Sequence, residues 1–471
     1  MKRAPLHIKL LIPLIAIVLG SCADLKVKEE LTYFGGEIIN PKLPYVLLSK
    51  NSKVIDTIAL DDNNFFMYQI KDLESGLYSF RHREYQLLYI EPGDSIMLRV
   101  NTFEFDESLA FTGKGSVKNN FLINMFLHNE RENNKMPSFY QLNPEEFEKA
   151  LDSMSDARSE IFAHFSKKMN PSEGFIEVAQ AGIDYDYYSK KELYPFAHYG
   201  SNHLQNMENL PADFYDFRKD IDYGNNNLAT YYPYYQYLKM HLDNLTYSTY
   251  MKRAKFNRKS HLHTTTKIHL IDSLITHQEL KNNLIYLAAH RFILHAKDTK
   301  NNEEMLGIFA SKNNNEKQLT SLKKLISYCD NMMPGKPLPN QMVVTSENTI
   351  KDLQSMIKRP TILFFWSTQS SSHYKRIHNR AAELKAKFPE YDFIGISVDE
   401  NHENWLNAIA AKGYNPEKEF RFNDVRKAEE QLVLNSANKA IITDKHGNIV
   451  LNNTNLYLSN FESQLVGLLN Q

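Results

Sequence analysis

Residues 361–374 read TILFFWSTQSSSHY, an apolar run that passes directly into a short polar segment. The first part, from Thr361 to Trp366, is almost entirely large and apolar, which is typical of a strand buried on both faces of a sheet. The serines that follow, Ser370 to Ser372, favour a helix start because a serine hydroxyl can cap the first turn. The stretch therefore predicts a central strand followed by a helix over residues 370–388.

Strands and helices alternate in the sequence around this stretch, which implies a sheet covered by helices on both faces. Beyond the first strand and helix, the pattern predicts a strand at 393–398, helices at 403–412 and 429–434, a strand at 440–443 that begins a hairpin, and a final helix at 458–469. The segment PGKPLP at 334–339 breaks the preceding helical pattern. We therefore place the start of a C-terminal α/β domain at residue 334.

The C-terminal part resembles the TlpA/ResA-like group of thioredoxin-fold proteins. The motifs that carry the resemblance are Phe365-Trp366, Val398-Asp399 with Trp405 following, and Thr443-Asp444 with Gly447 and Ile449. The resemblance covers about residues 335–471 and implies a thioredoxin fold. The resemblance also implies the activity of that group, which is thiol–disulfide exchange. In this reaction a thiolate at a helix N-terminus attacks a disulfide, and a second cysteine resolves the intermediate.

The groups that perform this exchange are missing from the sequence. Ser370 and His373 occupy the two cysteine positions, and Asn438 occupies the position of the family's cis-proline. We expect a trans bond at Asn438, because a cis bond without proline costs about 2.5–4 kcal/mol. A Ser370–His373 nucleophile pair is a weaker alternative, since no orienting carboxylate is evident. We predict no catalytic residue here and name Trp366, Ser371 and Ser372 as candidate binding residues.

The N-terminus carries a second informative pattern. Lys2, Arg3 and Lys9 are followed by an apolar run at residues 10–20, which is too short to span a bilayer as a mature helix. The next residues, up to Cys22, resemble a bacterial lipobox. We therefore predict a lipoprotein signal peptide over residues 1–22 and a lipid anchor on Cys22, which places the protein in the cell envelope, facing the periplasm, with the outer membrane favoured.

The sequence contains 2 cysteines, and lipid on Cys22 would leave Cys329 as the one thiol. No intrachain disulfide could then form. Cys329 lies in a helical pattern and is expected to be a small buried apolar residue. These points argue against a redox enzyme, although an oxidoreductase or peroxiredoxin-like enzyme that uses Cys329 remains an alternative.

Residues 23–115 show short β-prone runs separated by turn signals, and this spacing predicts an antiparallel β-sandwich. The region resembles a domain of unknown function found before thioredoxin domains in lipoproteins of the Bacteroidota. That resemblance rests on residues 36–41, on Tyr78 and on the turn at residues 91–94.

Residues 116–333 change to a helical period, with predicted helices at 144–169, 172–188, 234–245, 265–276, 280–295 and 302–328. Two tyrosine clusters, at 184–188 (DYDYY) and 231–237 (YYPYYQY), are expected to pack these helices together. The alternative is an exposed aromatic patch that would make the protein a surface component binding glycan or peptide.

Net charge and histidine spacing argue against two further classes, nucleic-acid-binding proteins and metalloproteins. A formal net charge of -1 gives no support for a nucleic-acid partner. The pairs His261/His263 and His290/His295 do not have the spacing of a zinc site, so we expect neither metal nor cofactor. The sequence thus predicts a multidomain, lipid-anchored, redox-inactive thioredoxin-like protein that works by binding a protein or peptide partner.

Overall fold

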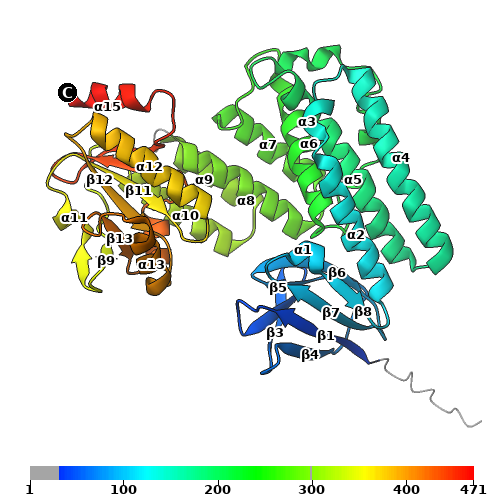
Figure 1. Ribbon diagram of the computed structural model, residues 1–471. Coiled ribbons are helices and arrows are strands. Elements are labelled where there is room, and N and C mark those ends of the chain that lie inside the picture. The colour runs from blue at the N-terminus through cyan, green and yellow to red at the C-terminus, as the bar shows by residue number, and fades with distance from the viewer. Residues whose placement is uncertain (1–30, 297–299, 471) are drawn as a thin grey trace, which may run out of the picture. The chain divides into compact units, whose positions relative to one another are not determined.

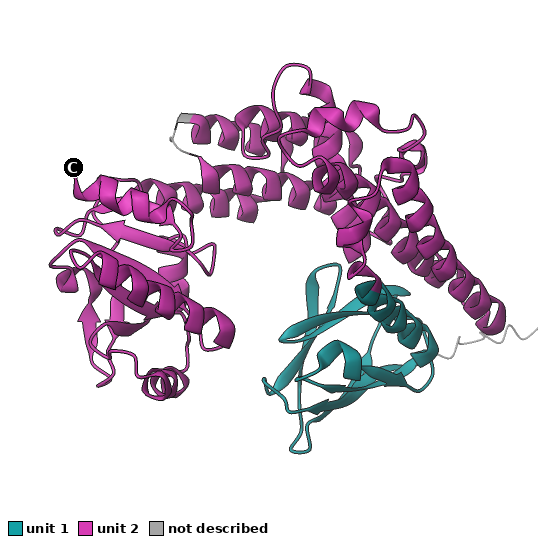
Figure 2. Ribbon diagram, turned by 45° about the horizontal axis from the view of Figure 1, so that its top comes forward, with its two compact units in different colours: residues 1–131 teal, residues 132–471 magenta. Residues whose placement is uncertain are grey.

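The structure is a computed structural model that describes residues 31–296 and 300–470 (Figure 1). The chain divides into two compact units, Met1–Arg131 and Glu132–Gln471 (Figure 2). The predicted signal peptide, Cys22 and residues 23–30 lie outside the described residues. Within the described ranges, no helix combines the length and the apolar character that crossing a membrane requires.

The first unit is rich in β-structure. Its strands are β1 (Thr32–Ile39), β2 (Tyr45–Lys50), β3 (Lys53–Ala59), β4 (Phe65–Ile70), β5 (Gly76–His82), β6 (Glu84–Ile90), β7 (Ser95–Asn101) and β8 (Ala110–Thr112). They form two four-stranded sheets, in the orders β4-β1-β7-β8 and β3-β2-β5-β6. The short helix α1 (Phe105–Ser108) precedes β8, and α2 (Ser116–Asn133) follows it.

One hydrophobic cluster joins the two sheets of this unit. Phe34 and Ile38 on β1 point into it, as do Val46 and Leu48 on β2, because side chains two residues apart share one face of a strand. β1 pairs with β7 in parallel, however, so the first sheet is mixed. The predicted antiparallel sandwich is therefore confirmed only as a β-rich region.

The second unit begins with a helical region. Its helices are α3 (Met136–Phe139), α4 (Pro144–Met169), α5 (Glu173–His198), α6 (Tyr232–Tyr250), α7 (His261–Leu274), α8 (Gln278–His295), α9 (Lys300–Lys312) and α10 (Glu316–Asn331), with the 3₁₀ turns η1 (Leu204–Asn209) and η2 (Asp216–Asp220) between α5 and α6. The single helix predicted at 302–328 is wrong, because the chain breaks between α9 and α10. Asn315 causes the break: its side chain accepts hydrogen bonds from the backbone N–H groups of Lys317 and Gln318 and so starts a new helix.

The tyrosine clusters pack helices against one another. Tyr234 and Tyr237 on α6 are 0% exposed, and Tyr185 on α5 is 8% exposed. The rings of Tyr185 and Tyr234 meet edge to face at a centroid distance of 4.8 Å. The packing role is confirmed for these side chains, and they form no exposed aromatic patch.

The second unit ends in a seven-stranded sheet of order β10-β9-β13-β12-β11-β14-β15. The strands are β9 (Met342–Val344), β10 (Ile350–Asp352), β11 (Thr361–Trp366), β12 (Asp392–Ser397), β13 (Glu419–Phe422), β14 (Ala440–Thr443) and β15 (Ile449–Thr454). The helices are α11 (Leu353–Met356), α12 (Ser371–Lys387), α13 (His402–Lys412), α14 (Val425–Gln431) and α15 (Phe461–Leu469). The central strand β11 runs parallel to β12 and antiparallel to β14.

The two faces of β11 enter two different cores, which explains its unbroken apolar sequence. Ile362, Phe364 and Trp366 pack with apolar residues of α12, α13 and α15. Leu363 and Phe365 face the other way and pack with residues of α11 and α14. The predicted central strand with helices on both faces is confirmed.

Candidate functional site

The candidate site is the turn that joins β11 to α12, at residues 367–370. The buried carboxylate of Asp399 holds this turn: its Oδ1 accepts from the Ser367 hydroxyl at 2.6 Å, and its Oδ2 accepts from the backbone N–H of Thr368 at 2.7 Å. The Ser397 hydroxyl, at the end of β12, donates to the same Oδ2 at 2.8 Å. The turn is therefore anchored to the sheet and positions the start of α12.

Ser370 lies at the first cysteine position and is exposed. It precedes the first turn of α12, but its side chain makes no capping hydrogen bond. The predicted serine cap is therefore wrong for Ser370, and Ser371 and Ser372 are exposed on the first turn.

His373 and Asn438, which stand at the second cysteine position and at the proline position, contact each other. The Nε2 of His373 and the Oδ1 of Asn438 are 3.1 Å apart. Because an amide oxygen can only accept, Nε2 is the donor. Within the described ranges every peptide bond is trans, including those at Asn438. No hydrogen bond joins the side chains of Ser370 and His373 among the described residues, so the Ser370–His373 nucleophile pair is not assembled in this geometry.

A buried polar cluster lies beneath the turn and consists of Trp366, His378 and Glu419. The indole Nε1 of Trp366 donates to Glu419 Oε2 at 2.9 Å, and His378 Nε2 lies 3.2 Å from Glu419 Oε1. Trp366 is 1% exposed, so it is a core residue and presents no surface to a ligand. The imidazole of His378 also stacks on Tyr414, with centroids 3.8 Å apart.

The hydrogen bonds of this cluster identify one ring nitrogen of His378 as a donor. His378 Nδ1 is 2.6 Å from the carbonyl oxygen of Tyr374, so Nδ1 must donate. Burial raises the pKa of Glu419, and the hydrogen bonds with His378 and Trp366 only partly offset that rise. His378 Nε2 can then accept from a protonated Glu419 or, in an imidazolium, donate to its carboxylate. The raised pKa of Glu419 shifts this balance toward the protonated acid relative to an exposed glutamate.

Glu419 fits because glycine stands beside it on the neighbouring strand. Gly395 of β12 pairs with Glu419 of β13, and a Cβ at Gly395 would lie 2.4 Å from Glu419 Oε2. Sequence reasoning missed both the strand and its glutamate, because EFRF at 419–422 is short and follows the polar loop GYNPEK at 413–418. Its alternation of polar and apolar residues is the signal that could have found it.

Cys329, the thiol that could supply exchange chemistry, lies on α10 and is partly buried. Burial raises the pKa of its thiol to about 11. The charge of Lys439 acts in the opposite direction, but its ammonium donates to the carbonyls of Leu432 and Val433 at 2.9 and 2.7 Å. The thiol is therefore protonated near neutral pH and is a poor nucleophile.

The histidines of the helical region serve as hydrogen-bonding side chains. His263 is 1% exposed and lies between Tyr250 and Asp243. Across residues 31–296 and 300–470, no group of three or more His, Cys, Asp or Glu side chains is arranged to hold a metal ion.

Residues 358–449 match a family model described as thioredoxin-like. Among solved structures, the thioredoxin domain of a thiol-disulfide oxidoreductase from Bacteroides vulgatus is 18% identical, with 29% of this chain and 96% of that chain covered and a TM-score of 0.24. A thiol:disulfide interchange protein from a Bacteroides species is also 18% identical, covering 29% and 91%, with a TM-score of 0.26. No curated protein matches the chain. The family match and the sheet around β11 together identify the C-terminal part as a thioredoxin-like domain.

Proposed function

We propose that the protein is a lipid-anchored component of the cell envelope whose thioredoxin-like domain binds a protein or peptide and does not exchange disulfides. The observation that carries this proposal is the contact between His373 and Asn438. It joins the second cysteine position to the proline position, while Ser370 occupies the first cysteine position. Serine cannot form the mixed disulfide through which exchange proceeds.

The alternative of an oxidoreductase that uses Cys329 has little support. A thiol with a pKa of about 11 is almost entirely protonated at neutral pH, and exchange requires the thiolate. No second cysteine lies within the described residues to resolve a mixed disulfide. The alternative of glycan binding through the tyrosine clusters has less surface to use, because Tyr234 and Tyr237 are buried, although Tyr232 is 60% exposed.

The proposed binding surface is the exposed start of α12. Ser371 and Ser372 expose hydroxyl groups there, next to the turn that Asp399 fixes. The first turn of a helix also has backbone N–H groups that lack partners within the helix. A rigid turn that presents such donors suits recognition of an extended peptide, whose backbone carbonyls can accept from them.

A thiol–disulfide exchange assay with insulin as the disulfide substrate tests the redox part of the proposal. We expect no activity from the wild-type protein or from Cys329→Ser. The double variant Ser370→Cys/His373→Cys is the matched gain-of-function variant, because the helix start lowers the pKa of a thiol placed there. Wild-type activity that Cys329→Ser abolishes would contradict the proposal.

Lipid anchoring is tested by expressing the full chain in a bacterial host and separating membranes from soluble material. We expect the wild-type protein in the membrane fraction, labelled by an alkyne-bearing fatty acid. Cys22→Ser should lose the label, whereas Cys329→Ser should keep it. Equal labelling of Cys22→Ser and wild type would exclude Cys22 as the acylation site.

A further inference from the structure

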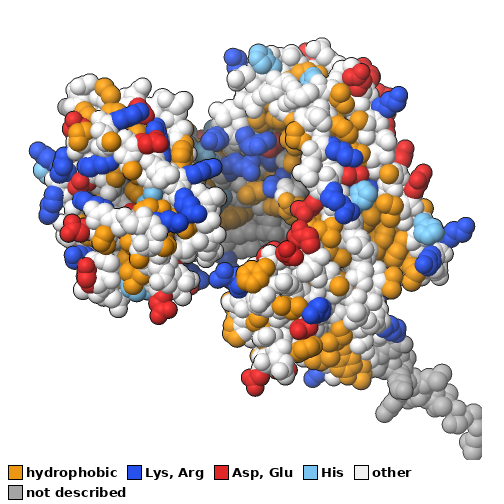
Figure 3. All heavy atoms as spheres, in the orientation of Figure 1, with side chains coloured by type: hydrophobic (Ala, Val, Ile, Leu, Met, Phe, Trp, Pro, Cys, Tyr) orange, Lys and Arg blue, Asp and Glu red, His pale blue; other side chains and the backbone are white. Residues whose placement is uncertain are grey.

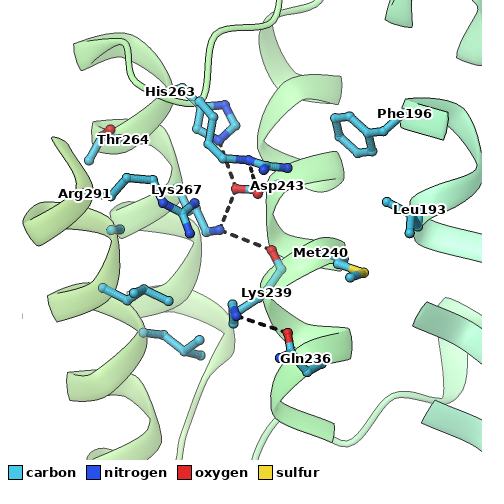
Figure 4. A pocket seen from close by; sticks show the side chains of 14 residues that line it. Leu193, Phe196, Gln236, Lys239, Met240, Asp243, His263, Thr264, Lys267 and Arg291 are labelled. Atoms are coloured by element: carbon cyan, nitrogen blue, oxygen red, sulfur yellow. Dashed lines mark hydrogen bonds and ion pairs between the residues drawn. The ribbon is translucent and has the colours of Figure 1, made fainter. Parts of the chain in front are cut away.

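The helical region contains a cavity of about 210 Å³ between α5, α6, α7 and α8 (Figure 4). Drug-sized ligands occupy pockets of roughly 300–1,000 Å³, so this cavity suits a smaller molecule. Figure 3 shows Lys and Arg side chains gathered in a hollow of the surface near α7 and α8. The cavity is part of neither the thioredoxin-like domain nor the candidate site described above.

The charges that line this cavity are unbalanced. Four cationic side chains face one carboxylate, Asp243; they are Lys239, Arg258, Lys267 and Arg291. Asp243 already pairs with Lys267 at 2.5 Å and with Arg258 at 2.7 Å. His263 adds no charge when its Nε2 donates to Asp243 and its Nδ1 accepts from Tyr250, and burial lowers its pKa. Asp243 balances only one of the two cations that it pairs with, so positive charge remains in excess, and Lys239 and Arg291 add the larger part of it.

Lys239 and Arg291 have no carboxylate partner within the described residues. The Nζ of Lys239 donates to the amide oxygen of Gln236 at 3.0 Å, which is a neutral acceptor. The guanidinium of Arg291 has no side-chain hydrogen bond within the same ranges, and in Figure 4 it extends toward Lys267. Burial, together with the charge of Arg291, lowers the pKa of Lys239. The two cations thus repel each other, and an anion between them would remove that repulsion.

The rest of the lining is apolar. Leu193 and Phe196 of α5 stand on one side, and Leu284 and Leu287 of α8 stand on the other. Inorganic phosphate has no apolar part that could contact these walls. A planar guanidinium can bind a carboxylate through two parallel hydrogen bonds, and the apolar walls can then cover a short hydrocarbon body.

We propose that this cavity binds a small organic carboxylate, with Arg291 and Lys239 on the carboxylate and the leucines around its apolar part. Lys267 and Asp243 form the buried base of the site, because they pair with each other and their positions are fixed by α6 and α7. The ligand would supply the anion that the described residues do not place beside Arg291.

Isothermal titration calorimetry with the whole protein tests the proposal, using hexanoate as the probe. We expect hexanoate to bind, and hexanamide, which has the same shape without the charge, to bind at least about tenfold more weakly. Inorganic phosphate should also bind more weakly than hexanoate. No detectable hexanoate binding, or equal affinity for hexanoate and hexanamide, would overturn the proposal, and tighter binding of phosphate would overturn the choice of an organic acid.

Two variants locate the binding. Arg291→Gln and Lys239→Gln should each weaken hexanoate binding about tenfold or more, and each removes a cation without leaving a carboxylate unpaired. Lys281→Gln is the matched control, because it removes a charge from the same helix, α8, at a position outside the cavity lining. Circular dichroism confirms that all three remain folded. Hexanoate affinity that all three variants leave unchanged would place the binding elsewhere and refute the site.

Discussion

Glu192 and Glu419 are both buried glutamates, one in the helical region and one in the thioredoxin-like domain, and their pKa values move in opposite directions. Burial alone would raise both pKa values. Glu192 is 0% exposed, but the guanidinium of Arg218 and the hydrogen bond from His241 lower its pKa to about 2. Glu419 has His378 and Trp366 as partners, and burial dominates there, so its pKa rises.

The difference shows that the partner decides the charge of a buried carboxyl group. Arg218 donates to Glu192 from Nε at 2.8 Å and from Nη2 at 2.6 Å, which makes a bidentate pair with a permanent cation. Trp366 donates one neutral N–H to Glu419. The helical region therefore holds a buried ion pair, whereas burial in the thioredoxin-like domain shifts Glu419 toward its protonated form.

Removing the cation from the first pair should have the largest effect. Arg218→Met leaves the Glu192 carboxylate buried without its cation, and breaking such a pair typically costs about 3–5 kcal/mol of stability. Urea unfolding followed by far-ultraviolet circular dichroism, which reports mainly on helix, measures the loss. Lys219→Met is the matched control, because Lys219 pairs with Asp216 on the exposed surface. A loss in Arg218→Met no greater than in Lys219→Met would contradict the buried ion pair.

Replacing the second carboxyl by an amide should change how stability depends on pH. The pKa of Glu419 is raised in the folded state, so its contribution is full below the ordinary pKa of glutamic acid, about 4.3, and is lost as pH rises through the folded pKa. Glu419→Gln keeps a neutral group that can donate to His378 and accept from Trp366. We expect the variant to lose less stability than wild type as pH rises above about 5.

Tryptophan fluorescence measures this effect in the right place, because both tryptophans of the chain, Trp366 and Trp405, lie in one core of the thioredoxin-like domain. Glu192→Gln should change the pH dependence of stability in the opposite direction. The lowered pKa of Glu192 means that its contribution is full above about 4.3 and is lost as pH falls through about 2. Identical pH profiles for wild type and Glu419→Gln would show that the pKa of Glu419 is not raised in the folded protein.

The smallest effect is expected where a hydrogen bond is only partly buried. Asn438→Ala removes the acceptor of His373, and such a neutral hydrogen bond contributes about 0.5–1.5 kcal/mol net. We expect a loss at the lower end of that range in urea unfolding followed by tryptophan fluorescence. His373→Ala should give a similar loss, and the double variant should lose no more than either single variant. Additive losses would show that the two side chains do not interact.

The sequence by itself determined that residues 361–366 form a strand covered on both faces. The unbroken apolar run at 361–366 can be accommodated only where both faces of a strand are covered, and β11 is such a strand. Helix-start chemistry predicted α4 to the residue, because Pro144 and the acidic residues that follow it favour the first turn of a helix. Cys22 and the signal peptide stay predictions, since they lie outside the described residues.

Only the tertiary structure decided which distant side chains meet. Glu419 contacts Trp366 and His378 because β13 lies next to β12, and strand order within a sheet does not follow from local periodicity. The cavity around Arg291 arises in the same way, since helices far apart in the sequence bring their cations together. Periodicity specifies which face of an element is buried, whereas burial between particular partners sets the charge and the chemistry of each group.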